Sequence, residues 1–211
     1  SKEKQAETTN IYAYTTPVLV IITVIIAFYS IDVFIAKMVF SEEMAGYYAI
    51  ASILGKTILW GTIPISKAMF PLSAETHKTK SSGKVFSKAL IILISIIIVA
   101  LLVIYLFPSL IVRIFSGKYI TESSQILFYV SLGMSLLSIA NLIILYKLSL
   151  GRTRGSWLFA VFLLTEVFML ILFSSTLLAF SIAFALSSLI FLIGSILLLN
   201  HETVNYHSSP Q

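Results

Sequence analysis

Three ionisable side chains lie deep inside stretches that are otherwise apolar enough to cross a membrane: Asp32, Lys56 and Glu166. A charge near the bilayer centre costs about 2.5–3.5 kcal/mol even on the most lenient insertion scale, so it normally has a partner or a role. Lys56 is either neutralised by a carboxylate, or it faces a wet cavity and binds an anion. The two acids either form a buried ion pair that fixes helix packing, or they bind a proton or another cation. The sequence leaves both pairs of alternatives open.

The spacing of these residues places them at comparable depths. Lys56 follows Glu43 by 13 residues, which is about 20 Å along a helix and near mid-membrane. Asp32 precedes the turn between the two stretches, and a long lysine side chain could reach it. Glu166 could instead face Lys56 from across a helical bundle. Ser52 shares the helical stripe of Lys56, so the candidate substrate-binding residues are Lys56, Asp32, Glu166 and Ser52.

Other polar residues in the apolar stretches favour simpler interpretations. Lys37 and Lys67 lie near the ends of their stretches, where a lysine can extend its ammonium group to the membrane interface. Serines recur at helical spacing in two later stretches, a pattern typical of positions where helices approach closely. These serines are Ser131, Ser135 and Ser138, with Asn141 beside them, and Ser181, Ser188 and Ser195.

No set of residues predicts catalysis or a bound cofactor. The sequence has no cysteine, and its three histidines, His77, His201 and His207, lie in polar segments without metal-ligand spacing. No loop offers a nucleophile with a base, a pair of acids or a phosphate-cradling glycine loop. We therefore expect that the chain is not an enzyme and has no catalytic residues, no metal and no cofactor.

The composition indicates that membrane helices position these residues. Hydrophobic residues make up 58% of the chain and charged residues 11%, with a mean hydropathy of +1.01, whereas soluble domains contain about 25% charged residues. A chain of 211 residues has room for about six spans and no separate aqueous domain. The formal charge of +5 reflects lysines and arginines in loops, so it bears on orientation and predicts no nucleic-acid partner.

We therefore predict an all-α, polytopic membrane protein built as a bundle of six transmembrane helices. The predicted helices span about 11–40, 43–72, 86–112, 123–147, 155–174 and 177–200, after a polar lead at 1–10 and before a polar tail at 201–211. Pro108 is expected to break or kink the third helix near its end. The turn between the last two helices is predicted at Ser174, Ser175 and Thr176.

The distribution of lysines and arginines predicts the orientation. Nine of them fall on the side that the two termini would share, and three fall on the other side, counting Lys37 at its boundary. Because positive residues accumulate on the cytoplasmic side, both termini are expected to be cytoplasmic in the cell membrane. An even number of spans also allows a second, parallel unit to be joined to this one, as in some transporters.

The chain resembles the polysaccharide (O-antigen type) flippases of the multidrug/oligosaccharidyl-lipid/polysaccharide exporter superfamily. Asp32-Val33 late in a span, Ser41 to Ala49 opening the next and Met69-Phe70-Pro71 closing it occur in the order and spacing of that family. Downstream, Phe115 to Tyr119 and the turn at Gly151-Arg152 are similar to it as well. The resemblance is to the second, C-terminal six-helix lobe of a family whose members have two such lobes around a central cavity.

The resemblance implies a function for the complete protein. It would move a polyprenyl-pyrophosphate-linked oligosaccharide across the cytoplasmic membrane by alternating access, together with an N-terminal six-helix lobe that this chain lacks. Lys56 would then meet the diphosphate, while Asp32 and Glu166 would keep the empty cavity near neutral or couple an ion. Two alternatives remain: a membrane scaffold that only packs against partners, and an exporter of small molecules from the same superfamily.

Overall fold

The computed structural model describes residues 3–76, 81–152 and 155–198, and no strand occurs among them. The helices are α1 (Glu3–Val39), α2 (Glu42–Thr76), α3 (Ser82–Leu106), α4 (Pro108–Ser116), α5 (Thr121–Ser149), α6 (Phe159–Leu172) and α7 (Leu177–Leu198), with a 3₁₀ turn, η1 (Ser156–Leu158), before α6. The predicted tail at 201–211, His77 and positions 78–80 of the predicted loop lie outside the described residues.

Five of these helices are long and apolar enough to cross a membrane. They are Thr15–Val39 within α1, then α2, α3, α5 and α7, while Ser156–Leu172 forms a shorter apolar helix of about 25 Å. Large apolar side chains such as Ile98, Tyr105 and Ile193 are exposed on the outer faces of the bundle, as expected for surfaces that contact lipid. The protein is therefore an all-α, polytopic membrane bundle, and this prediction is confirmed.

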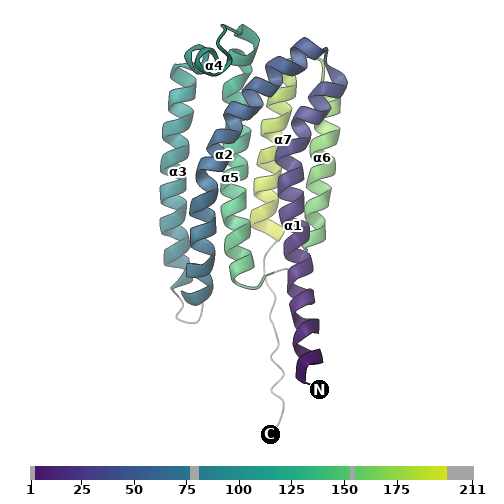
Figure 1. Cartoon of the computed structure of the whole chain (residues 1–211), viewed down its shortest axis with the longest axis vertical. Coiled ribbons are helices and arrows are strands. Elements are labelled where there is room, and N and C mark those ends of the chain that lie inside the picture. Colours follow the sequence, from purple (N-terminus) through teal and green to yellow (C-terminus); the bar gives the residue numbers. More distant parts are fainter. Residues whose placement is uncertain (1–2, 77–80, 153–154, 199–211) are drawn as a thin grey trace.

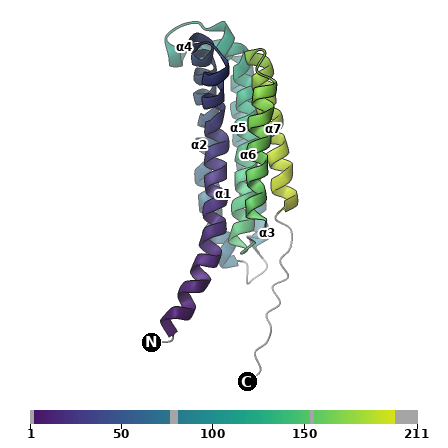
Figure 2. The ribbon, with the colours of Figure 1, turned by 90° about the vertical axis from the view of Figure 1, so that its right-hand side faces the viewer.

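The helices run alternately up and down, so that the start of α1 and the end of α7 lie at the same end of the bundle (Figure 1). α5 lies at the centre and packs against α2 on one side and α7 on the other. α3 flanks α2, and α1 packs against both α2 and α6. Figure 2 shows α1 extending past the rest of the bundle at its N-terminal end, while α4 lies at the opposite end.

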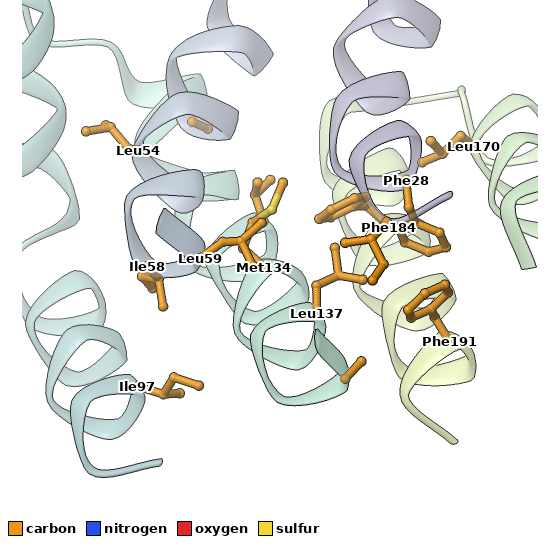
Figure 3. Close-up of a cluster of buried hydrophobic side chains, with 14 of the residues drawn as sticks. Phe28, Leu54, Ile58, Leu59, Ile97, Met134, Leu137, Leu170, Phe184 and Phe191 are labelled. Atoms are coloured by element: carbon orange, nitrogen blue, oxygen red, sulfur yellow. The ribbon is translucent and has the colours of Figure 1, made fainter. Parts of the chain in front are cut away.

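The core is a continuous apolar cluster that joins all the long helices (Figure 3). Met134 and Leu137 of α5 lie between side chains of α2 and α7, and the rings of Phe28 and Phe191 meet at 4.7 Å between α1 and α7. Gly133 allows α5 and α7 to approach closely, because a Cβ there would lie 2.6 Å from the Phe184 ring. Small and large residues thus interlock across the central interfaces.

The observed helices differ from the predicted spans most at two places. The predicted third span at 86–112 is divided into α3 and α4, because Pro108 cannot donate a backbone hydrogen bond and instead occupies the first turn of α4. The segment predicted as a polar lead is already helical from Glu3 onward. The chain turns between α6 and α7 at 173–176, where the Thr176 hydroxyl accepts a hydrogen bond from the Ala179 amide at 3.1 Å and so caps α7.

Candidate functional site

A buried carboxylate joins α1 to α2. Asp32 of α1 is fully buried and accepts hydrogen bonds from the Lys56 ammonium at 3.2 Å, the Ser52 hydroxyl at 2.6 Å and the Tyr48 hydroxyl at 3.2 Å. Lysine and hydroxyl donors share the two oxygens, since Lys56 reaches Oδ1 and the hydroxyls reach Oδ2. We call these four residues the Asp32 cluster.

The sequence of α2 explains why three donors converge on one acceptor. Tyr48, Ser52 and Lys56 are spaced by four residues, so they lie along one face of α2. Lys56 follows the start of α2 by 14 residues, about 21 Å, and Asp32 precedes the end of α1 by seven, about 10 Å. The lysine side chain therefore spans a difference in depth to reach its partner. The pair lies within the membrane-spanning part of both helices.

Glu166 lies close to this cluster but is not bonded to it. It belongs to α6, which packs against α1, and it is fully buried. It interacts electrostatically with Asp32 and Lys56, yet within the described residues neither of its carboxyl oxygens has a hydrogen-bond partner. Of the two partners that the sequence offered to Lys56, the structure thus selects Asp32 for the ion pair.

A crevice of about 460 Å³ opens between α1, α2 and α5, toward the end where α1 begins. Its walls are mainly aliphatic, and its polar lining residues are Lys67, Asn141 and Tyr29. Lys67 is the one charged residue among those that line it, and its side chain is exposed. The other lining residues are Val18, Ile22, Ile25, Ile26, Ile63, Phe70, Leu145 and Leu148. We call this site the α1–α2 crevice.

The location of the crevice changes the roles expected of the lysines. Lys56, the predicted cavity lysine, does not line the crevice, and neither do Asp32, Ser52 and Glu166. Lys67, interpreted from the sequence as an interfacial residue, is the cation that does. It follows the start of α2 by 25 residues, about 37 Å, so a position near the interface and a position in the crevice are compatible.

One polar residue of the site was not singled out from the sequence, and the remaining polar residues contribute to helix packing. Tyr48 was missed, although its spacing of four residues from Ser52 was a usable signal. Lys147 donates to the carbonyls of Ser195 at 2.9 Å and Ile196 at 2.5 Å, so it satisfies the last turn of α7. The serines predicted at close helix contacts are buried, and most of them bond to carbonyls of their own helices: Ser135, Ser138, Ser181, Ser188 and Ser195.

Comparisons with known proteins add no relative: no family model, no curated protein and no solved structure matches this chain. Within the described residues, no group of three or more histidine and acidic side chains is arranged to hold a metal ion. The case for a function therefore depends on the Asp32 cluster and on the α1–α2 crevice.

Proposed function

We propose that this chain is one lobe of a membrane transporter that moves a polyprenyl-pyrophosphate-linked oligosaccharide across the cytoplasmic membrane by alternating access. The observation that carries the proposal is the α1–α2 crevice, with its apolar walls and single cation, Lys67. The motifs of the hairpin from Asp32 to Pro71, which resemble those of polysaccharide flippases, indicate the same substrate class.

The crevice suits a molecule with an apolar chain and an anionic group. Aliphatic side chains of α1 and α5 would pack against part of the isoprenoid chain through van der Waals contacts, which drive association between apolar groups in lipid. Lys67 would bind the diphosphate through a charge-assisted hydrogen bond, and no acid among the lining residues competes for it. Asn141 and Tyr29 supply neutral polar groups to the same site.

In this proposal Lys56 has a different role from the one that the family resemblance implies. Its ammonium is bound to Asp32 and does not line the crevice, so Lys56 links α1 and α2 through an ion pair. We call this ion pair the latch. The latch holds the two helices together in the half of the bundle near their connection. The crevice separates their side chains toward the opposite end. Helices joined at one end and parted at the other are suited to alternating access, in which two parts of a transporter rock about a site.

Orientation and partner follow from the same proposal. Lys84, Lys88, Lys147 and Arg152 belong to the end of the bundle that contains the start of α1, and Lys37, Arg113 and Lys118 belong to the other. The positive-inside rule then makes the end with the crevice cytoplasmic. A lipid-linked glycan assembled in the cytoplasm would enter there, and a second six-helix lobe would close the cavity.

A binding measurement tests the proposal. The chain in nanodiscs of neutral lipid is titrated with a polyprenyl-diphosphate-linked oligosaccharide, and bound ligand is counted by native mass spectrometry. Lys67→Gln should weaken binding about 10- to 100-fold, since a hydrogen bond to a charged group contributes about 1.5–3 kcal/mol. Lys88→Gln, at an exposed lysine outside the crevice, is the matched control and should bind like the wild type.

The same titration separates the alternative functions. A glycolipid of the same chain length without phosphate should bind weakly, and equally to both lysine variants. A scaffold predicts that neither lipid binds saturably. The observation that supports a scaffold is the Asp32–Lys56 pair, because a purely structural protein would also use it to join α1 and α2. A small-molecule exporter predicts tighter binding of apolar cations or drugs than of the diphosphate lipid, and that result would count against the proposal.

A further inference from the structure

Glu166 is a buried acid that has no hydrogen-bond partner in the described part of the chain. Both of its carboxyl oxygens are inaccessible, and within the described residues neither of them accepts or donates a hydrogen bond. An ionised carboxylate in such a place would destabilise the fold far more than a neutral carboxyl group, because burial removes the hydration of the charge and no hydrogen bond replaces it. The proposed transport function gives this residue no role, and the α1–α2 crevice does not include it.

The charges around Glu166 do not balance if it is ionised. The ionisable groups that interact with the site come from α1 and α2: Asp32, Lys56 and Tyr48. α7 and η1, which also pack against α6, have no ionisable side chain, and α6 has no other. One ammonium and two carboxylates would leave a net charge of −1 inside the bundle. A proton on Glu166 restores neutrality.

We propose that Glu166 holds a dissociable proton, and that loss of this proton draws the Lys56 ammonium from Asp32 to Glu166. In the step, the O–H bond of the Glu166 carboxyl breaks, the proton passes to water, and the carboxylate left behind accepts a hydrogen bond from Lys56, which stays protonated. The ionic link then joins α2 to α6 instead of α2 to α1.

The unequal bonding of the two acids makes this exchange feasible. Asp32 keeps two hydroxyl donors, Ser52 and Tyr48, when Lys56 leaves, so its carboxylate is still partly satisfied. Glu166 has no donor of its own in the described structure and depends on Lys56 for any compensation. Among the described residues, Lys56 is also the one cation that interacts with both acids. The proposal is independent of what the crevice binds.

Infrared spectroscopy of the full chain in nanodiscs detects the proton directly. At neutral pH the wild type should show the carbonyl stretch of a protonated carboxylic acid, and this band should be lost in Glu166→Gln. Glu75→Gln, at an exposed acid on α2, is the control and should retain the band. Absence of the band in the wild type, or its persistence in Glu166→Gln, would overturn the proposal.

A distance measurement tests the transfer of Lys56. Because the chain has no cysteine, spin labels are placed at Phe34→Cys on α1 and Ile53→Cys on α2, two exposed positions beside the Asp32 cluster. When alkaline pH removes the infrared band, the distance between the labels should lengthen or broaden in otherwise wild-type protein. The same labels in Glu166→Gln should show no change with pH. An unchanged distance after loss of the band refutes the transfer, and an equal change in Glu166→Gln refutes the role of Glu166.

Discussion

At the scale of single residues, the structure resolves how a membrane protein keeps charges in its interior. Asp32 is satisfied by one ammonium and two hydroxyl groups, all supplied by a single face of α2. A buried pair of this kind adds little net stability compared with apolar residues, because desolvation offsets attraction. Removing one partner is another matter, since the remaining charge is then buried without an opposite charge beside it. The Asp32 cluster therefore specifies how α1 and α2 meet more than it stabilises the fold.

Lys56→Met tests this view of the Asp32 cluster. The substitution leaves the Asp32 carboxylate without its cation and should lower the free energy of unfolding by about 3–5 kcal/mol, measured by thermal unfolding in detergent at neutral pH. The double variant Asp32→Asn/Lys56→Met removes both charges and should recover much of that loss. Lys67→Met, at an exposed lysine, is the control and should unfold close to the wild type. Equal stability of Lys56→Met and wild type would contradict the pairing.

At the scale of helices, the close contacts of α5 organise the bundle. Gly133 faces the Phe184 ring and the Ala185 backbone of α7, and Gly55 of α2 faces Val130 and Ser131 of α5. Such contacts give van der Waals packing, which drives helix association in lipid where the hydrophobic effect between helices is absent.

Gly133→Ala is expected to disturb the α5–α7 contact. The added methyl group would lie 2.6 Å from the Phe184 ring and 3.3 Å from the Ala185 Cα, so the ring must shift or the helices must separate, at a cost of about 1–3 kcal/mol. Gly61→Ala is the matched control, because no atom lies within 4 Å of its added Cβ, and better helix propensity should make it neutral or slightly stabilising. Thermal unfolding of both purified variants distinguishes them, and equal stability would contradict the importance of the close contact.

The same scale shows what could be predicted from the sequence. Long apolar stretches and turn residues predicted an all-helical membrane bundle, and Pro108 marked the break that separates α3 from α4. Helix spacing allowed Lys56 to pair with either Asp32 or Glu166. Only the packing of α6 against α1, which the sequence does not show, distinguishes the two pairings. The crevice lysine was not predicted, because whether Lys67 meets lipid, water or a crevice depends on how α1, α2 and α5 diverge. Tertiary geometry of this kind leaves no local pattern in the chain.

At the scale of the whole molecule, the Asp32 cluster and the α1–α2 crevice lie at different levels along the bundle axis. The Asp32 cluster joins α1 and α2 in the half of the bundle near their connection, and the α1–α2 crevice opens toward the other end. Glu166 approaches the cluster from α6, which packs against α1. This arrangement is consistent with a transport lobe in which one end of a helix pair is latched while the other admits an anionic lipid. The central claim is therefore that the crevice serves transport.

The most direct test is transbilayer movement of the lipid itself. Vesicles containing the chain together with the second lobe that the proposal requires are loaded with a fluorescent polyprenyl-diphosphate-linked oligosaccharide, and an impermeant quencher added outside reports how fast the inner-leaflet pool becomes accessible. We predict faster movement than in protein-free vesicles, a rate at least about tenfold lower in Lys67→Gln, and an unchanged rate in Lys88→Gln. A wild-type rate equal to that of protein-free vesicles, or an equal rate in Lys67→Gln and wild type, would contradict the account.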